Sequence, residues 1–337
     1  MNRREVLRTA ALTLGVLSAA GAGTRTVGRA RARQAELDVT ASPRVAPVTV
    51  QVSPNVRLHG VQSGWIAVKE AHVRLRGPSA LRLPAIVAGT RWAAPIPILS
   101  WIVEHPEGVV VVDAGERADA RDLDAYTRHA DPGNRFIIRG NFRVNVHPDD
   151  ELGPQLRRLG LSRRDVRHVV QTHLHFDHAG GLTHVPRAEV LVAREELDGQ
   201  RALPVGALRS VWPPELEPRP VDVRPADTPG FAREHVLTRA GDVVIVPTPG
   251  HSYGHQSVIV HGDDRAYLLA GDVTFDEAQL LRRELAGIVH DVARAADSLE
   301  RTRAFVRSTP TVFLPSHDAS SLARLAARQI TTVPDAG

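Results

Sequence analysis

One segment of this 337-residue chain indicates both its fold and its chemistry: Thr172-His173-Leu174-His175-Phe176-Asp177-His178. It places three imidazoles and one carboxylate within six residues, directly after a predicted strand at 166–171. In the turn from strand to helix, His173 and His175 are predicted to point the same way, and Asp177 and His178 toward a neighbouring point. Imidazole and carboxylate groups are ligands of zinc and similar cations, and without a cation crowded imidazoles repel one another when protonated. The segment therefore predicts a metal site.

Three further candidate ligands each follow a predicted apolar strand. They are His251 after 243–246, Asp272 after 267–270 and His317 after 312–314. Strand ends are where α/β folds place functional groups, and a small residue before each candidate lets the backbone turn sharply. Of the other histidines, His255 is expected to hydrogen-bond around the site. The remaining ten are expected to be ordinary surface or core residues.

Short β-branched runs alternate with amphipathic segments, which predicts a mixed α/β fold with sheets covered by helices. Residues 101–104 and 109–112 form a predicted hairpin, and the second strand is apolar on both faces, so we expect it to be buried. It ends at Asp113, which is expected to orient a ligand histidine or the turn. Further along, Asp131-Pro132-Gly133-Asn134 is a strong turn signal.

The sequence resembles the metallo-β-lactamase superfamily of metal-dependent hydrolases, and within it the branch that contains N-acyl homoserine lactonases. His173-Leu-His175-Phe-Asp177-His178 is similar to the His-x-His-x-Asp-His signature of that superfamily. The resemblance extends over about residues 95–330. Its other matching segments lie at 95–115, 179–181, 248–251, 254–257 and 271–272.

This resemblance implies a four-layer αβ/βα sandwich with two divalent metal ions between the sheets. Zinc is the expected metal, and iron, manganese and cobalt suit the same ligands. One ion would be bound by His173, His175 and His251, the other by Asp177, His178 and His317, with Asp272 bridging. The implied activity is the opening of a lactone or ester by metal-bound hydroxide, with Asp177 as the catalytic residue that passes a proton to the leaving oxygen.

One position departs from the lactonase pattern. Those enzymes usually carry a tyrosine three residues after the bridging aspartate, and this chain has Phe275, which cannot donate a hydrogen bond. Either the second metal alone polarises the carbonyl, or another group such as Tyr253 substitutes, or the substrate differs. The alternative substrates are a phosphotriester, thioester or β-lactam on the same metal centre. An iron oxidoreductase and a non-catalytic metal binder are further alternatives.

Two long connecting segments, 116–148 and 201–230, are candidate lids over a pocket. Under the lactonase interpretation, their apolar side chains would bind the acyl chain of the substrate. Phe136, Phe142 and Trp212 are the candidates, and plain packing is the alternative role for each.

Residues 1–33 are expected to be an export signal, with a charged head followed by an uncharged stretch at 9–24. Arg3-Arg4 resembles the twin-arginine type, which predicts a periplasmic or extracellular protein. A frayed basic helix is the alternative. Residues 34–94 are interpreted as linker and N-terminal strands, with a linker over 34–60 that leads into an edge strand, and 95–337 as the metallo-hydrolase domain.

Composition narrows the possible partners. Lysine and arginine exceed acidic residues by four, but residues 1–33 hold seven arginines and one acid, so the remainder has a net charge of −2. No basic cluster stands out, which argues against a nucleic-acid partner. No uncharged apolar run is long enough for a stable membrane anchor, and the absence of cysteine excludes thiolate metal ligands. A small ester or lactone is the expected partner, and the oligomeric state is not predicted.

Overall fold

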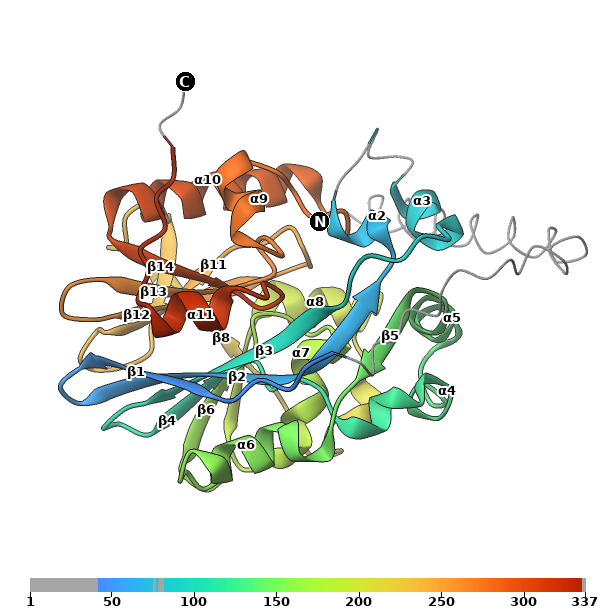
Figure 1. Cartoon of the computed structure of the whole chain (residues 1–337), viewed down its shortest axis with the longest axis horizontal. Helices are drawn as coiled ribbons and strands as arrows, with labels where there is room; N and C mark the ends of the chain where they lie inside the picture. The colour runs from blue at the N-terminus through green and yellow to red at the C-terminus, as the bar shows by residue number, and fades with distance from the viewer. Residues whose placement is uncertain (1–41, 75–76, 78–81, 335–337) are drawn as a thin grey trace, which may run out of the picture. The chain divides into compact units, whose positions relative to one another are not determined.

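The computed structural model describes residues 42–74, 77 and 82–334. The predicted export signal at 1–33 lies outside these residues. The first sheet has the strand order β1-β2-β3-β4-β6-β7-β8, with β5 beside β2 (Figure 1). Its strands are β1 Val48–Ser53, β2 Val56–Val68, β3 Ile96–Glu104, β4 Val109–Val112, β5 Phe142–Asn145, β6 Val166–Val170, β7 Glu189–Ala193 and β8 Arg219–Val221.

The second sheet has the order β14-β13-β12-β11-β10-β9. Adjacent strands of this sheet pair antiparallel, except for β13 and β14, which pair parallel. In the first sheet, the consecutive strands β4, β6, β7 and β8 also pair parallel. Its strands are β9 Arg224–Pro225, β10 Arg233–Val236, β11 Val243–Pro247, β12 Gln256–His261, β13 Ala266–Gly271 and β14 Thr311–Pro315.

Alternation along each strand divides the apolar side chains between two faces. On β3, Leu99 and Trp101 point toward the second sheet and Ile98 and Ile102 point away from it. On β13, Leu269 packs between the sheets and Leu268 packs on the opposite face. The two sheets therefore share one core and each has a second apolar face, which must be covered by helices.

Helices cover both of these outer faces. The first sheet is covered by helices that include α5 and α6, whose Ile138, Leu152 and Leu156 join its outer core, and the second by α9 and α10 (Figure 1). This arrangement confirms the predicted four-layer αβ/βα sandwich. The helices are α2 Glu70–Val73, α3 Arg82–Ala88, α4 Leu123–Tyr126, α5 Pro132–Asn141, α6 Leu152–Arg158, α7 Phe176–Ala179, α8 Arg194–Ala202, α9 Glu277–Arg282, α10 Val292–Ser308 and α11 Ser321–Ala326.

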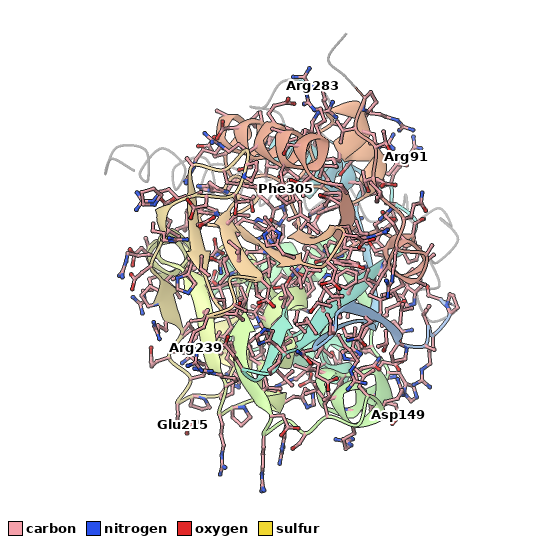
Figure 2. The ribbon with its side chains drawn as sticks, turned by 90° about the vertical axis from the view of Figure 1, so that its left-hand side faces the viewer. Arg91, Asp149, Glu215, Arg239, Arg283 and Phe305 are labelled. Atoms are coloured by element: carbon pink, nitrogen blue, oxygen red, sulfur yellow. The ribbon has the colours of Figure 1, made fainter. Side chains whose placement is uncertain are left out.

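Helix α10 is amphipathic, with Leu299, Phe305 and Val306 on its buried face. Figure 2 shows Phe305 of α10 in the interior, where it packs with the second sheet, whereas the charged side chains of Glu215, Arg239 and Arg283 lie at the periphery. Among the described helices, none combines the length and apolar character needed to cross a membrane.

Two local predictions are wrong. Residues 48–60 are not linker, because they form β1 and the start of β2, and the alternating pattern Val48-Thr49-Val50-Gln51-Val52 is that of a half-buried edge strand. Moreover β2 pairs with β3, so the proposed boundary at residue 94 lies between adjacent strands of one sheet.

The second wrong prediction is the turn at Asp131. This residue caps α5 and accepts a hydrogen bond from the backbone amide of Asn134 at 3.0 Å. The same residue types favour both structures.

Candidate metal centre

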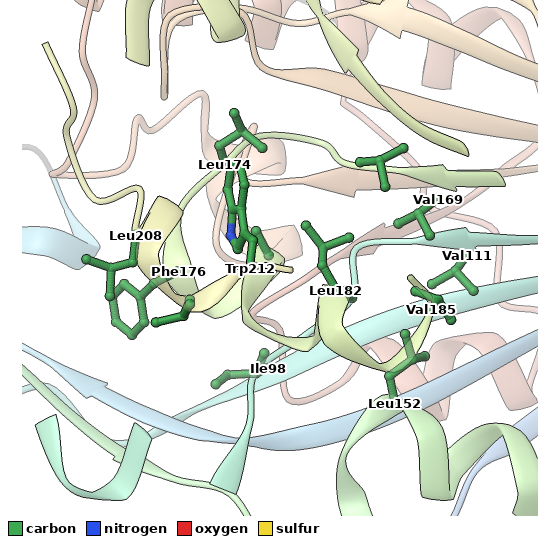
Figure 3. Close-up of a cluster of buried hydrophobic side chains, with 14 of the residues drawn as sticks. Ile98, Val111, Leu152, Val169, Leu174, Phe176, Leu182, Val185, Leu208 and Trp212 are labelled. Atoms are coloured by element: carbon green, nitrogen blue, oxygen red, sulfur yellow. The ribbon is translucent and has the colours of Figure 1, made fainter. Parts of the chain in front are cut away.

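The seven predicted ligands lie together at the ends of strands from both sheets. His173 and His175 follow β6, and Asp177 and His178 belong to the short helix α7. From the second sheet come three more, which follow β11, β13 and β14: His251, Asp272 and His317. Leu174 and Phe176, between the ligands of the motif, point into the core of the first sheet, so the alternation of the motif separates ligands from packing residues (Figure 3).

Three ring nitrogens converge in the first group. His175 Nδ1 lies 2.9 Å from His173 Nε2 and 3.1 Å from His251 Nε2. These three side chains could hold one metal ion. Burial, with the neighbouring imidazoles, lowers the pKa of His175 and of His251 to about 3, so both rings are neutral at pH 7. Neutral imidazoles keep a lone pair for a cation.

The second group consists of Asp177, His178 and His317. His317 Nε2 lies 3.3 Å from His178 Nε2 and 3.4 Å from Asp177 Oδ2. Burial alone would lower the pKa of His178, but the carboxylates of Asp272, Asp113 and Asp177 outweigh it and raise that pKa to about 10. Metal binding here would therefore release a proton.

Asp272 lies between the two groups. Its Oδ2 is 3.3 Å from His251 Nε2 and 3.4 Å from His317 Nε2, and its Oδ1 is 3.4 Å from His178 Nε2. Burial raises the pKa of Asp272, but the surrounding imidazoles lower it well below its usual range. Oδ1 is buried and has no hydrogen-bond partner among the described residues. A carboxylate with a free oxygen inside a ring of imidazole nitrogens fits a bridging ligand of two divalent cations.

Outer hydrogen bonds fix the orientation of three candidate ligands. The Nδ1 atom of His251 lies 3.1 Å from the Ile288 carbonyl, and that of His317 lies 2.8 Å from the Pro97 carbonyl. Since a carbonyl only accepts, both Nδ1 atoms carry a proton and both Nε2 atoms face the cluster. His178 Nδ1 donates in the same way to Asp113 at 2.8 Å. Such partners set the tautomer and raise the basicity of metal-binding histidines.

Asp113 makes the contacts predicted for it. Its carboxylate accepts hydrogen bonds from the Thr172 amide at 2.7 Å and from the Thr172 hydroxyl at 2.8 Å, besides that from His178. Because the Thr172 hydroxyl donates to Asp113, its oxygen is left to accept from His173 Nδ1 at 3.0 Å. Asp113 also has a φ of 60°, a conformation that costs energy for a residue other than glycine. One carboxylate thus orients ligands of both groups.

His255 holds the backbone of Asp272, as expected for a residue around the site. Its Nε2 accepts from the Asp272 amide at 2.9 Å, so its Nδ1 must donate to Thr248 Oγ1, also at 2.9 Å. Gly271, the residue before Asp272, has a φ of 56°, and a Cβ at this position would lie 2.5 Å from His255 Nε2. Only glycine fits without a shift.

Substitution of Gly271 by alanine should destabilise the protein by about 2–5 kcal/mol, the sum of a left-handed conformation and overpacking. Gly241→Ala is the matched control, because its φ is 77° and a Cβ there meets no atom within 4 Å. That control should lose about 1–2 kcal/mol. Urea denaturation measures both, and equal losses would contradict the packing role of Gly271.

The sequence interpretation missed Glu196 on α8, which ties two ligand-bearing loops together. Its carboxylate accepts from the Leu174 amide at 3.2 Å and from the Gly254 amide at 2.9 Å, and the residue is fully buried. The surrounding helix sequence is strongly polar, so no local signal distinguishes this glutamate from the exposed ones.

A narrow cavity of about 50 Å³ adjoins the candidate metal centre. The candidate ligands that reach it are His175, Asp177, His251, Asp272 and His317. Its remaining walls are almost entirely apolar: Ile66, Val68, His72, Ile96, Ile137, Ile138, Phe142, Phe176, Val205, Gly206, Phe275 and Ile288.

Of the aromatic residues predicted to contact the substrate, some line this cavity and others lie in the core or at the surface. Phe142 and Phe275 line it, and the Phe275 ring centre lies 5.1 Å from that of His317. Phe136 is 46% exposed, whereas Trp212 packs beside Leu174 in the core (Figure 3). Tyr253 does not line the cavity, and its hydroxyl donates to the Leu203 carbonyl at 3.0 Å. Tyr253 therefore does not supply the hydroxyl that Phe275 lacks.

Comparison with known proteins agrees with this geometry. The family model of the metallo-beta-lactamase superfamily matches residues 93–317. A "Probable metallo-hydrolase Rv2300c" of Mycobacterium tuberculosis is 33% identical over 187 residues, which cover 53% of this chain and 57% of that protein. The N-acyl homoserine lactonase AttM of Agrobacterium fabrum is 23% identical over 280 residues, or 80% of this chain and 95% of that enzyme.

Solved structures show the same fold. An N-acyl homoserine lactone hydrolase with the product N-hexanoyl-L-homoserine at its catalytic metal centre superposes with a TM-score of 0.62 at 20% identity, covering 78% of this chain and 93% of that one. The chain belongs to the metallo-β-lactamase superfamily. It spans a little over half of the length of the Mycobacterium tuberculosis relative.

Proposed function

We propose that the protein opens lactones or esters with an apolar acyl chain, at a centre of two divalent cations, zinc first among them. The observation that carries the proposal is the position of Asp272, whose Oδ2 faces His251 and His317 at the edge of an apolar cavity. Each cation would have three further ligands: His173, His175 and His251 for one, and Asp177, His178 and His317 for the other.

Bound divalent cations supply a nucleophile from water near pH 7 and polarise the carbonyl that it attacks. The protein supplies the rest. Asp177 reaches the cavity and lies 3.4 Å from His317, so it is placed to pass a proton to the leaving oxygen. The apolar walls formed by residues such as Phe142 and Ile138 would keep water from the scissile bond and contact the part of the acyl chain next to it.

A substrate panel on the purified protein tests this proposal. We expect N-acyl homoserine lactones or aryl esters to be hydrolysed faster with long chains than with short ones. Chelation should abolish the activity and zinc, iron, manganese or cobalt should restore it. Hydrolysis of a phosphotriester, a thioester or a β-lactam with no activity on lactones or esters would contradict the proposal.

We also propose that residues 1–33 direct export by the twin-arginine route to the periplasm or beyond it. The support is the pair Arg3-Arg4 ahead of the uncharged stretch 9–24. The double substitution Arg3→Lys and Arg4→Lys keeps the charge and should retain the full-length chain in the cytoplasm of a bacterial host. Cell fractionation measures the effect, and unchanged export of the variant would contradict the proposed route.

A further inference from the structure

The cavity beside the candidate metal centre contains one polar side chain that is not a predicted ligand. Of the described residues that line it, apart from the candidate ligands, only His72 has a side chain with hydrogen-bonding atoms. His72 lies on α2 and is 1% exposed. Its ring meets the Phe142 ring edge to face, with 5.1 Å between the ring centres.

The ring of His72 is held in place, and its only polar neighbour named among the described residues is the backbone of Lys69, which does not form a hydrogen bond of normal geometry with it. The backbone is anchored at both ends, since the His72 amide donates to the Lys69 carbonyl at 2.8 Å and the His72 carbonyl accepts from Ile288 at 3.0 Å. In contrast, neither ring nitrogen makes a hydrogen bond of normal geometry with the described residues, although both nitrogens are buried. Most buried polar side-chain atoms in folded proteins have a partner, so an unpaired pair of nitrogens beside a reactive centre indicates a role in binding.

The ring is neutral under ordinary conditions. Burial lowers the pKa of His72 to about 4, because it outweighs the contact with the Lys69 backbone, which raises that pKa; the nearby Lys69 ammonium lowers it further. A neutral imidazole offers one N–H donor and one lone-pair acceptor. It can therefore recognise a polar group on a ligand without bringing a charge into an apolar cavity.

We propose that His72 is a substrate-binding residue whose ring hydrogen-bonds an oxygen atom of the lactone or ester. This inference rests on the proposed function. The other non-ligand walls of the cavity, including Phe275 and Phe142, offer a substrate no polar contact from their side chains. The oxygen atoms of an acyl substrate and the nitrogens of His72 are thus each other's available partners in this cavity. His72 thereby selects substrates that place an oxygen opposite α2.

His72→Phe removes both nitrogens and retains an aromatic ring against Phe142. We expect the kcat/KM of the best lactone or ester to fall by about 10- to 100-fold, since a buried polar group left without its partner changes an equilibrium by that order. Metal content should stay the same. The Tm should stay equal or rise, because the variant no longer buries unpaired polar atoms. His72→Gln restores a donor and an acceptor and should recover part of the activity.

His59→Phe is the matched control. His59 is 2% exposed and lies outside the cavity, but its ring is paired with Thr49 Oγ1 at 2.8 Å and Glu104 Oε2 at 3.3 Å. The same substitution there should lower the Tm and leave kcat/KM of the folded protein within about twofold of wild type. Activity loss with retained stability at position 72, and the reverse at position 59, separates a binding role from a structural one.

Binding without turnover provides a second readout on the wild-type protein. The probe is the γ-lactam analogue of a long-chain N-acyl homoserine lactone, with Kd from calorimetry and the His72 ring nitrogens followed by ¹⁵N NMR. We expect the lactam to shift the His72 resonances and to bind His72→Phe about 10-fold more weakly or worse.

The outcomes separate the two proposals. Wild-type protein that neither hydrolyses lactones or esters nor binds the lactam overturns the proposed function and this inference with it. Wild-type protein that does both, with His72→Phe unchanged in kcat/KM and in Kd, overturns the assignment of His72 alone. Loss of metal or of folding in His72→Phe, with no shift of the wild-type His72 resonances, would also overturn that assignment by showing a structural role.

Discussion

Asp272→Ala should reduce kcat/KM by about 1,000-fold or more and release metal, while the chain remains folded. The reason is geometric: this one carboxylate lies within 3.3–3.4 Å of His251, His178 and His317, so its loss removes the link between both groups of ligands. His173→Ala should have the same consequence, because it removes one of the three converging nitrogens of the first group.

Circular dichroism, metal analysis and steady-state kinetics test this expectation together. Asp264→Ala is the control, because Asp264 is exposed, pairs with Arg265 at the surface and lies far from the site in the fold, on the turn that precedes β13. It should retain both metal and activity. Wild-type activity in either Asp272→Ala or His173→Ala would show that the ligand assignment is wrong.

Asp113→Asn should weaken metal binding by about 10- to 100-fold, the usual cost of losing an outer carboxylate on a metal-binding histidine. The carboxylate of Asp113 accepts from His178 Nδ1 and, through Thr172, orients His173. The amide keeps the size of the side chain but lacks the charge and one acceptor oxygen. Activity at saturating metal should fall less than metal affinity does.

Chelator competition measures the metal affinity of this variant. Asp165→Asn is the control, since Asp165 accepts from the Ser162 amide at the far end of β6, outside the site. Its metal affinity should equal that of the wild type. An Asp113→Asn affinity within about twofold of wild type would contradict the orienting role of Asp113.

The sequence predicts the fold and the ligands because both depend on local patterns. Short apolar runs define the strands, and candidate ligands such as His251 and Asp272 immediately follow such strands or their turns. Glu196 and His72 could not be predicted in this way, since their roles arise from contacts or cavities formed by elements far apart in the chain. Gly254 meets Glu196 across 58 residues, and Ile288 anchors the backbone of His72.

Capping chemistry accounts for the error at Asp131. A short segment of aspartate, proline, glycine and asparagine favours either a turn or the start of a helix, and the choice depends on how the next residues of the chain pack. Here Ile138 of α5 packs into the outer core of the first sheet, and that burial favours the helix. The error at residues 48–53 has another cause, since their alternating valines already have the pattern of a half-buried strand, and the structure pairs this strand with β2.

The most direct test of the central claim is the number and position of bound metal ions in the folded protein. Elemental analysis combined with anomalous X-ray diffraction should give two ions per chain. One should lie among His173, His175 and His251 and the other among Asp177, His178 and His317, with Asp272 between them. A single ion, none, or ions located away from these seven side chains would contradict the account.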